Sequence, residues 1–391
     1  MKSRVNKLVQ EMKPSGIRRF FDYAAEIPDV ISLGVGEPDF DTPWHVRETG
    51  ISALRSGKTF YTSNAGLTEL REEIARYTEK QIGVSYHAKN EVLVTVGGSE
   101  GIDVALRTII EPGDEVLYIE PCFVCYKACI ALAGGVPKEI PLREEDEFRL
   151  RPEDLERAIT DKTRVLIISF PNNPTGAIME EEDLRPIAEL AVRHDLIVIS
   201  DEIYADLTYK GKHTSIAALP DMRDRTIVIN GFSKAFAMTG WRLGYAMGPA
   251  DIVSQMTKVH QYAIMCAPTV SQYAAVEALR NGAKDVEMMR KSYDARRRFL
   301  LSEFKRIGIP CFEPYGAFYM FPNISEFGMS SDDFAMRLLK EENVAVVPGS
   351  AFGESGKNNL RISYAYSLGE LKRAMERIEI FVNRLRAKKN T

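Results

Sequence analysis

Short apolar runs of strand length alternate with longer helical patterns through the middle of the chain. The expected strands lie at Val92–Val96, Glu115–Ile119, Arg164–Phe170, Leu196–Ser200, Thr226–Asn230 and Gly244–Gly248. Helices are expected between most of them. Alternation of this kind is typical of a parallel sheet covered by helices on both faces, so the pattern predicts an α/β fold.

The pattern also divides the chain into parts. The alternation covers residues 46–285, which we expect to form one large domain. Beyond it, a long charged helix leads into three short strands, GAFYMF, VAVVPG and LRISYA, with helices around Asp332–Glu341 and Leu368–Leu385. Residues 286–391 therefore predict a smaller α+β domain. We expect residues 1–45, rich in Pro and Gly near their end, to cross back and join it.

Charge and composition narrow the classes of partner. The 391 residues carry 51 basic and 55 acidic side chains, a formal net charge of −4, with no long block of one sign to hold a polyanion. The N-terminal sequence lacks the continuous apolar core of a signal peptide, and the apolar runs around Leu166 and Ile197 are too short to span a bilayer. Five cysteines, an odd number, favour a reducing compartment. We expect a cytoplasmic protein that binds neither nucleic acid nor a membrane.

Three cysteines lie close together and raise the question of a metal site. Cys122, Cys125 and Cys129 have a spacing that suggests a metal or a cluster, but no fourth Cys or His nearby completes a recognisable ligand set. The five histidines are scattered without paired spacing. We expect no metal, and instead three small buried residues on one face of a helix.

A strand runs into Gly97, Gly98 and Ser99 and then directly into a helix. Such a junction can bind an anion, because glycines let the backbone approach closely, free N–H groups point outward and the helix dipole favours negative charge. Tight turns also use glycine for steric reasons, so this segment alone leaves both readings open. The GxGxxG and GxxxxGK[ST] patterns are absent here, which favours a phosphate-bearing cofactor other than a nucleotide.

Two polar segments follow directly on strands. In PNNPTG, residues 171–176, one X–Pro bond is a candidate for the cis form, and Asn173 can present its amide at the C-terminal edge of the sheet. Asp201 follows the next strand, with Tyr204 three residues later, and a buried carboxylate there needs a partner such as a pyridinium nitrogen. Taken alone, Asn173 fits an ordinary Asn-Pro turn better, and a helix cap is the alternative for Asp201.

The segment NGFSKAFAMTGWRLGY, residues 230–245, carries the strongest chemical pattern. Ser233 and Lys234 lie where an apolar strand gives way to a loop, and Arg242 follows eight residues after the lysine. A lysine here costs stability unless it reacts or is paired, whereas a desolvated amine has a lowered pKa and can form an imine with a carbonyl cofactor. Arg242 offers fixed donors to a phosphate. A surface lysine and a solvated arginine would explain neither the glycine-rich surroundings nor the position at the sheet edge.

Taken together, these segments resemble the fold-type I pyridoxal-phosphate (PLP) aminotransferases of the aspartate/aromatic group. The resemblance runs nearly from end to end and in the family's order, through LGVGEPDFDTP, YTSNAGLTELREEIA, GGSEGI, Pro121–Phe123, PNNPTG, DEIY, SKAFAMTGWR, GAFYMFP, VVPGSAFG and RISYA. It extends to bacterial N-acetyl-diaminopimelate aminotransferases. The resemblance implies a three-layer α/β/α large domain with a mostly parallel sheet, a smaller α+β domain built from both termini, and a homodimer with shared active sites.

The resemblance also implies roles for single residues. Lys234 would hold PLP as an imine and move the proton between the substrate α-carbon and the C4′ atom of the cofactor. Asp201 would pair with the pyridinium nitrogen and keep it protonated. Tyr204 and Asn173 would hydrogen-bond the 3′ oxygen of the cofactor, which lowers the pKa of the imine. Phe123 would stack on the ring.

The remaining implied contacts concern the phosphate and the substrate. The phosphate would lie among Gly97, Gly98, Ser99 and Arg242, with Tyr61 reaching the phosphate of the neighbouring subunit, and Ser233 would also bind the cofactor. Arg361 would clamp the substrate α-carboxylate, assisted by Asn173 and the backbone around Gly36. Ile17 falls in the segment that closes over the substrate in relatives. One departure is Gly231, where many relatives carry a Ser that contacts the phosphate, so a main-chain N–H or a water would have to replace that donor.

Substrate identity is less determined than the chemistry. No second arginine for a dicarboxylate can be assigned, so aromatic amino acids with 2-oxoglutarate are the first expectation, aspartate the second and N-acetyl-diaminopimelate a further possibility. A carbon–sulfur β-lyase would use the same lysine and cofactor. A ligand-sensing domain of the same fold would need a DNA-binding extension for which the N-terminus has no room. A nicotinamide dehydrogenase is disfavoured by the missing dinucleotide glycines.

Overall fold

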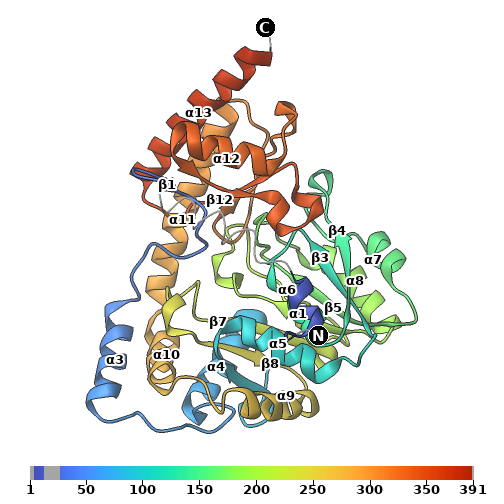
Figure 1. The fold of residues 1–391 in the computed structure, drawn as a ribbon. Coiled ribbons are helices and arrows are strands. Elements are labelled where there is room, and N and C mark those ends of the chain that lie inside the picture. The colour runs from blue at the N-terminus through green and yellow to red at the C-terminus, as the bar shows by residue number, and fades with distance from the viewer. Residues whose placement is uncertain (1–3, 13–26, 390–391) are drawn as a thin grey trace.

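The computed structural model describes residues 4–12 and 27–389. Its largest feature is a seven-stranded sheet in the order β2-β8-β7-β6-β5-β3-β4 (Figure 1). The strands are β2 Val92–Thr95, β3 Glu115–Glu120, β4 Val136–Pro141, β5 Thr163–Ser169, β6 Ile197–Asp201, β7 Thr226–Gly231 and β8 Gly244–Met247. From β4 to β7 neighbouring strands are parallel, whereas β8 is antiparallel to both β7 and β2. The predicted mostly parallel sheet is confirmed.

Strand β4 was missed in the sequence pattern. Its residues, VPKEIP, include two prolines, and most of them are exposed or half-buried. Proline cannot donate to a sheet ladder and is tolerated at an edge, where β4 lies beside β3. Only one residue of β4 is buried, so the strand has no apolar run that a sequence pattern could reveal.

Helices cover both faces of the sheet, as the pattern predicts. They are α3 Trp44–Arg55, α4 Thr68–Ile82, α5 Gly97–Ile109, α6 Cys125–Leu132, α7 Pro152–Ala158, α8 Glu181–Arg193, α9 Ala250–Ala263 and α10 Thr269–Asn281, with a short helix α1 at Lys7–Glu11. Alternate strand residues face opposite layers. Ile229 and Ala246 pack in the cluster that contains residues of α5 and α9, whereas Val228 and Met247 pack in the cluster with residues of α4 and α10.

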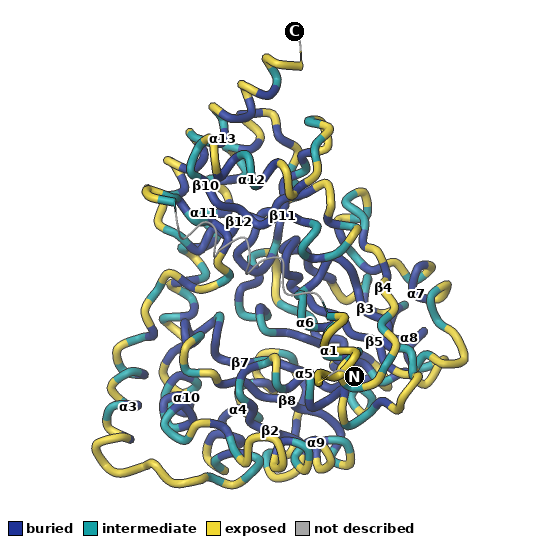
Figure 2. The backbone as a smooth tube through the Cα atoms, in the orientation of Figure 1, coloured by how far each residue is buried: buried dark blue, intermediate teal, exposed yellow. Residues whose placement is uncertain are grey.

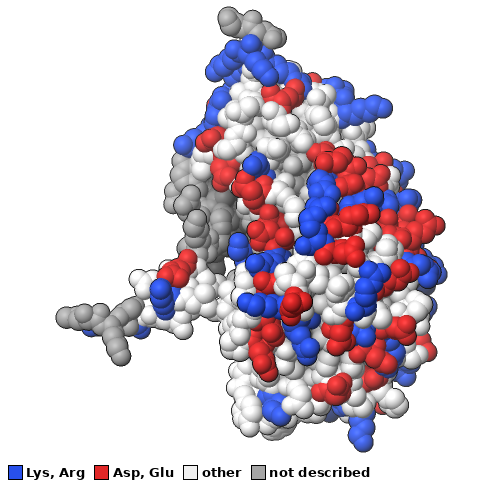
Figure 3. Space-filling model, turned by 90° about the vertical axis from the view of Figure 1, so that its right-hand side faces the viewer, with Lys and Arg blue, Asp and Glu red and all other residues white. Residues whose placement is uncertain are grey.

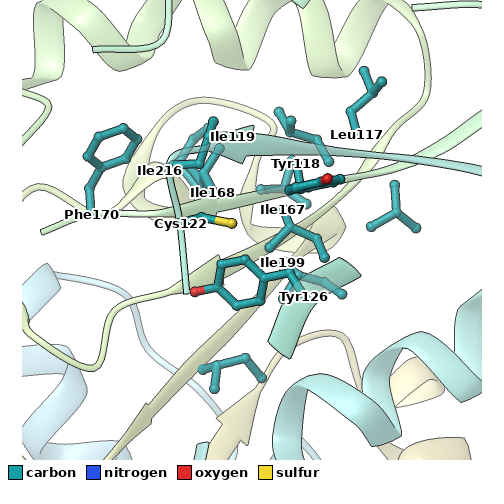
Figure 4. Packing of buried hydrophobic residues seen from close by; sticks show 14 of the residues in the cluster. Leu117, Tyr118, Ile119, Cys122, Tyr126, Ile167, Ile168, Phe170, Ile199 and Ile216 are labelled. Atoms are coloured by element: carbon teal, nitrogen blue, oxygen red, sulfur yellow. The ribbon is translucent and has the colours of Figure 1, made fainter. Parts of the chain in front are cut away.

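The interior on the α5 side is continuous along the parallel strands. Leu117, Ile167 and Ile199, one from each of three neighbouring strands, lie together with Tyr126 of α6 (Figure 4). Figure 2 shows the strands buried and the outer helix faces exposed. The strands therefore read as nearly continuous apolar runs because both of their faces are covered.

The C-terminal part forms two small sheets and three helices. Its elements are α11 Ala283–Arg306, β9 Tyr319–Met320, α12 Ser331–Glu342, β10 Val344–Ala345, β11 Val347–Pro348, β12 Leu360–Ser363 and α13 Leu368–Lys389. Strands β11, β12 and β9 form an antiparallel sheet, and β10 pairs in parallel with β1, Ile31–Ser32. The N-terminal segment thus joins this region (Figure 1). The exact domain boundaries at residues 45 and 285 stay a prediction.

One expected strand needs correction. The segment VAVVPG was predicted to be a single strand, but it is interrupted at Val346 into β10 and β11, which belong to different sheets. The whole segment from Val344 to Val347 is buried. A buried apolar run does not reveal where its backbone changes partner, so the interruption leaves no trace in the pattern.

The cysteine group also differs from the prediction. Cys122 is buried but precedes α6, whereas Cys125 and Cys129 lie in α6 and are only half-buried. They do not share one fully buried helical face. In the part of the chain that the structure describes, no group of three or more His, Cys, Asp or Glu side chains could hold a metal ion.

Surface features bear on the expected partners. Basic and acidic side chains are interspersed on the face shown in Figure 3. No helix in residues 4–12 or 27–389 is both long and apolar enough to cross a membrane.

Close glycine contacts hold the start of α5 against the sheet. Gly231 at the end of β7 pairs with Gly244 at the start of β8. A Cβ atom on Gly244 would lie 2.6 Å from the carbonyl carbon of Gly97 and 2.7 Å from the nitrogen of Gly98. Two backbones can approach this closely only without a side chain between them. The glycines therefore set the position of the α5 N-terminus.

We predict that Gly244→Ala destabilises the fold by about 1–3 kcal/mol, because the backbone must move to admit the methyl group. Gly240→Ala is the matched control, since a Cβ atom there has no neighbour within 4 Å. Urea denaturation of the two variants beside the unmodified protein gives the comparison. Equal unfolding midpoints for both variants would contradict the proposed contact.

Candidate active site

The predicted site residues come together in a cavity at the C-terminal ends of the parallel strands. Its volume is about 490 Å³. The predicted residues that line it are Gly36, Gly98, Ser99, Phe123, Asn173, Asp201, Tyr204, Ser233, Lys234, Arg242 and Arg361. Segments that are up to 327 residues apart in sequence meet here, as the hydrogen bond from Arg361 to Gly34 shows. The sheet edge is where ligands bind in open α/β folds.

Lys234 follows β7 and projects its amine into the cavity. The Nζ atom donates a hydrogen bond of 2.6 Å to the carbonyl oxygen of Gly36. Burial is the main cause that lowers the pKa of Lys234 to about 8, and the positive charges of Arg361 and Arg242 contribute to this lowering. The negative charges of Glu37 and Asp201 act in the opposite direction. A substantial fraction of the amine is therefore neutral near physiological pH and can attack a carbonyl group.

Asp201 is the last residue of β6 and is buried. Burial raises the pKa of its carboxyl group, while hydrogen bonds from the Tyr126 hydroxyl, at 2.6 Å, and the Ile203 N–H, at 3.2 Å, act in the opposite direction. No Lys, Arg or His of the described chain forms an ion pair with this carboxylate. A buried carboxylate of this kind fits a ligand with a protonated nitrogen.

Tyr126 was missed in the sequence. It lies on α6, three residues after Phe123, and its hydroxyl is fully buried against Asp201. The stacking candidate Phe123 lies in the same cavity wall, with its ring edge-on to Tyr126 at 6.0 Å between centroids. The spacing of three along a helical turn was the available signal, but nothing in the sequence connects position 126 to position 201.

Asn173 is held by a compact loop after β5. The Asn172 side-chain oxygen accepts hydrogen bonds from the Thr175 N–H at 3.2 Å and from its hydroxyl at 2.8 Å. Both X–Pro bonds of this loop, before Pro171 and before Pro174, are cis, where the sequence suggested one. The loop places the Asn173 amide oxygen 2.9 Å from a guanidinium nitrogen of Arg361.

Arg361 comes from β12 and is buried. Its two terminal nitrogens donate to Asn173 and, at 2.5 Å, to the carbonyl oxygen of Gly34. The guanidinium carbon lies 4.5 Å from the ring centroid of Tyr319 and 4.7 Å from that of Phe352. The Nε atom is buried and has no hydrogen-bond partner among the described residues. A fixed guanidinium with an unused donor fits a carboxylate ligand.

Tyr204 lies in the loop after β6, with its ring 5.8 Å from the Lys234 amine. Its hydroxyl is 2.6 Å from the hydroxyl of Tyr319, and both tyrosines are buried. Tyr319, the Tyr of GAFYMF, was given no role in the sequence reading. A tyrosine in an apolar strand reads as core packing, and only the structure places its hydroxyl in this site.

The predicted phosphate site is at the N-terminus of α5. Gly97 has φ +76°, and a Cβ atom there would lie 2.7 Å from a guanidinium nitrogen of Arg242. Arg242 donates to the Thr239 carbonyl oxygen at 3.0 Å. Ser99 is exposed to the cavity mouth and Ser233 is buried in its wall. Free helical N–H groups, a hydroxyl and a guanidinium form a suitable anion site.

The presence of Gly231 in place of the serine that many relatives carry has a steric reason. A Cβ atom at this position would lie 2.9 Å from the Cα atom of Gly244 and 3.1 Å from the carbonyl oxygen of Leu243. A Ser in its place would therefore require the two strands to move apart. The missing hydroxyl is a consequence of this close strand packing.

Two of the predicted residues that the structure describes, Gly97 and Tyr61, are not among the residues that line the cavity of one chain. Tyr61 is 82% exposed and lies in a separate surface pocket beside Phe60 and residues 266–270. Its predicted contact with the phosphate of a neighbouring subunit stays a prediction. Ile17 lies outside the described residues.

The geometry as a whole fits an aldehyde cofactor that carries a phosphate and a basic ring nitrogen. Lys234 supplies the reactive amine, Asp201 a partner for a protonated nitrogen, and the α5 N-terminus with Arg242 an anion site. Arg361 remains for the carboxylate of a second ligand.

Comparison with known proteins identifies the family to which the chain is similar. Residues 28–378 match the family model described as aminotransferase class I and II. The putative aminotransferase YugH of Bacillus subtilis is 53% identical and is matched over 98% of this chain and 100% of its own length. An aspartate aminotransferase of Pyrococcus abyssi is 48% identical, with 94% of this chain and 95% of that protein covered.

A solved structure gives the same result. The aromatic aminotransferase from Pyrococcus horikoshii superimposes with a TM-score of 0.90 at 48% identity, covering 93% of this chain and 99% of that one. The similarity therefore includes both the sequence and the three-dimensional fold.

The lowered pKa of Lys234 predicts how the cofactor-free protein captures PLP. With a pKa of about 8, roughly a quarter of the amine is neutral at pH 7.5, against about one part in a thousand for an ordinary lysine. The rate of capture, followed by absorbance, should rise with a midpoint near pH 8. Arg361→Ala should move the midpoint upward, because it removes a cation that disfavours the ammonium form.

Arg185→Ala is the control, since Arg185 forms an exposed ion pair with Glu181 on α8. Its midpoint should equal that of the unmodified protein. A midpoint near pH 10 in the unmodified protein, or the same midpoint with and without Arg361, would show that the amine is not desolvated as described.

Proposed function

The chain belongs to the class I and II aminotransferases and is a PLP-dependent transaminase, and we propose that it takes the amino group from an aromatic or aspartate-like L-amino acid and transfers it to 2-oxoglutarate. The observation that carries this proposal is the Lys234 amine, with its lowered pKa, in a cavity that also holds Asp201, Arg242 and Arg361. The names of relatives, which include aspartate and aromatic aminotransferases, support both donor classes.

In this proposal Lys234 both holds the cofactor and moves the proton. When bound, PLP supplies an electron sink for the charge that develops at the substrate α-carbon. The Lys234 amine, near a pKa of 8, can accept a proton from that carbon and return it, because neither protonation state is strongly favoured at neutral pH. Gly36, whose carbonyl oxygen accepts from Nζ, would orient the amine.

The other residues orient and tune the reacting groups. Asp201, held by the Tyr126 hydroxyl, would keep the ring nitrogen protonated. Tyr204 and Asn173 would hydrogen-bond the 3′ oxygen of the cofactor, and Phe123 would cover one face of its ring. Their common wall in the cavity supports these roles.

The proposed preference among amino-acid donors follows from the cationic groups of the cavity that could bind the donor's side chain. Among the described residues that line the cavity, the Lys and Arg side chains are Lys234, Arg242 and Arg361, and each already has a proposed role. The remaining wall includes the apolar side chains Val35 and Ile102. A second carboxylate therefore finds less support than an aromatic ring, so we place aromatic donors first and aspartate second.

A homodimer with shared sites is also part of the proposal. Phe60, Tyr61 and Tyr262 are 80%, 82% and 85% exposed. The segment around Phe60 lies against residues 265–270, because the Thr269 hydroxyl donates to the Phe60 carbonyl oxygen and Asn64 to that of Met265. Large apolar side chains gathered on a surface support burial against a second copy. Location in the cytoplasm stays a prediction from cysteine usage.

The test of the function is a panel of amino acids mixed with the yellow holoprotein, with loss of the cofactor's absorbance followed for each. Aromatic donors should convert the chromophore fastest and aspartate next, and added 2-oxoglutarate should restore it. Lys234→Ala should retain PLP noncovalently and lose turnover. Near-native transamination by that variant, or release of pyruvate and ammonia from cysteine or cystathionine as the main activity, would contradict the proposal.

For the dimer, light scattering should give twice the chain mass of 44.0 kDa. Tyr61→Phe should weaken PLP binding by about 10- to 100-fold, because it removes one hydrogen bond to a charged phosphate. Tyr262→Phe is the matched control on the same surface and should bind PLP normally. A monomer that binds PLP tightly would refute the shared site.

A further inference from the structure

Tyr319 touches two groups that the proposed function assigns to different ligands. Its hydroxyl lies 2.6 Å from the hydroxyl of Tyr204, which faces the cofactor in the proposal. Its ring lies 4.5 Å from the guanidinium carbon of Arg361, which faces the substrate carboxylate. Tyr319 itself is 1% exposed. No other described side chain contacts both residues in this way.

We propose that Tyr319 is a positioning residue, whose hydroxyl fixes the direction of the Tyr204 hydrogen bond and whose ring fixes the plane of the Arg361 guanidinium. This inference rests on the proposed function. It adds a group that acts through Tyr204 and Arg361 rather than on the reacting atoms.

The hydroxyl pair has two possible arrangements. If Tyr204 donates to Tyr319, the single hydroxyl hydrogen of Tyr204 is turned away from the cavity. If Tyr319 donates, the Tyr204 hydrogen is free to reach an acceptor in the cavity, such as the ring oxygen of the cofactor. Burial raises the pKa of both tyrosines, so both stay neutral and one must donate to the other. Cofactor binding therefore selects the arrangement in which Tyr319 donates.

The surroundings confine the Tyr319 hydroxyl to this role. The backbone of Gly36 packs against it so closely that a Cβ atom there would clash with the hydroxyl oxygen. The same Gly36 accepts the hydrogen bond of Lys234. The hydroxyl has little room to turn elsewhere, so it holds Tyr204 in one direction.

The ring performs the second part. The guanidinium of Arg361 contacts the rings of both Tyr319 and Phe352. Its terminal nitrogens donate to Asn173 and Gly34. The two rings cover the guanidinium and restrict its rotation, while its own delocalised bonds keep it planar. The free Nε atom then lies in a fixed plane. The effect of the hydroxyl on Tyr204 and the effect of ring packing on Arg361 can be separated experimentally. Phe352 packs on Arg361 with a ring that has no hydroxyl, so its replacement affects ring packing alone.

The test measures two quantities in each holoprotein variant: the pH midpoint of the cofactor's visible absorbance without substrate, and KM with kcat for an aromatic donor. Tyr319→Phe should raise the midpoint by about 0.5–1 pH unit, since Tyr204 becomes a weaker and less directed donor to the ring oxygen. Its KM should change less than about twofold. Phe352→Leu should do the reverse, raising KM and leaving the midpoint unchanged.

A double-mutant cycle supplies the decisive result. Tyr204→Phe should itself raise the midpoint, and adding Tyr319→Phe should then produce no further shift, because the hydroxyl acts only through Tyr204. If Tyr319→Phe shifts the pH midpoint equally in the unmodified protein and in the Tyr204→Phe background, the inference is refuted. An unchanged midpoint in the Tyr319→Phe single variant would refute it as well.

Controls separate this result from a general effect of burial. Tyr364→Phe removes another buried hydroxyl, which donates to the Ala317 carbonyl oxygen at 3.2 Å, and it should leave both quantities unchanged. If Tyr319→Phe does not fold, Tyr319→Leu should raise both the midpoint and KM, and an unchanged midpoint there would equally refute the inference. An unmodified protein that lacks a titrating chromophore or converts no donor would contradict the proposed function instead.

Discussion

The structure depends on keeping one lysine amine out of water among positive charges. After β7, the Lys234 amine donates to the carbonyl oxygen of Gly36, and burial together with two nearby guanidinium groups lowers its pKa. Such an arrangement is unfavourable for an ammonium ion and favourable for a neutral nucleophile. In the proposed function, the other groups of the cavity hold the cofactor and the substrate within reach of this amine.

The topology explains how so many groups reach this amine. Because β5, β6 and β7 are parallel neighbours, their C-terminal ends bring the Asn173 loop, Asp201 and Lys234 to one edge. The glycine contacts between β8 and α5 place the helix N-terminus beside the same edge. A further contribution comes from β12, whose Arg361 donates a hydrogen bond to Gly34 of the N-terminal segment. Arg361, the proposed substrate-binding cation, is thus positioned by the small sheets, and the groups proposed to bind the cofactor are positioned by the large one.

Some residues of the site can be predicted from the sequence, and others depend on contacts that only the folded structure shows. Residues at strand ends, such as Lys234 and Asp201, are predictable because an apolar run followed by a polar residue marks the sheet edge. Tyr319 could not be predicted, because its proposed role depends on the groups that its hydroxyl and ring contact, and the two residues of β9 carry no such information. Gly231 could be seen to differ from relatives, but the reason, contact with Gly244, is a distance between strands. The role of Tyr61 depends on a second chain.

The two central ionisable groups also show why this protein should be stabilised by its cofactor. Burial raises the pKa of Asp201 and lowers that of Lys234, so in the cofactor-free fold each charged form is disfavoured relative to the unfolded chain. The Asp201 penalty grows as pH rises above the ordinary aspartate range, and the Lys234 penalty grows as pH falls from about 10.5 toward 8. At neutral pH both penalties are present together. A ligand with a protonated nitrogen and an aldehyde removes both at once, and a ligand that binds only the folded state adds its binding free energy to stability. The features that make the site reactive are therefore the ones that make the empty protein less stable.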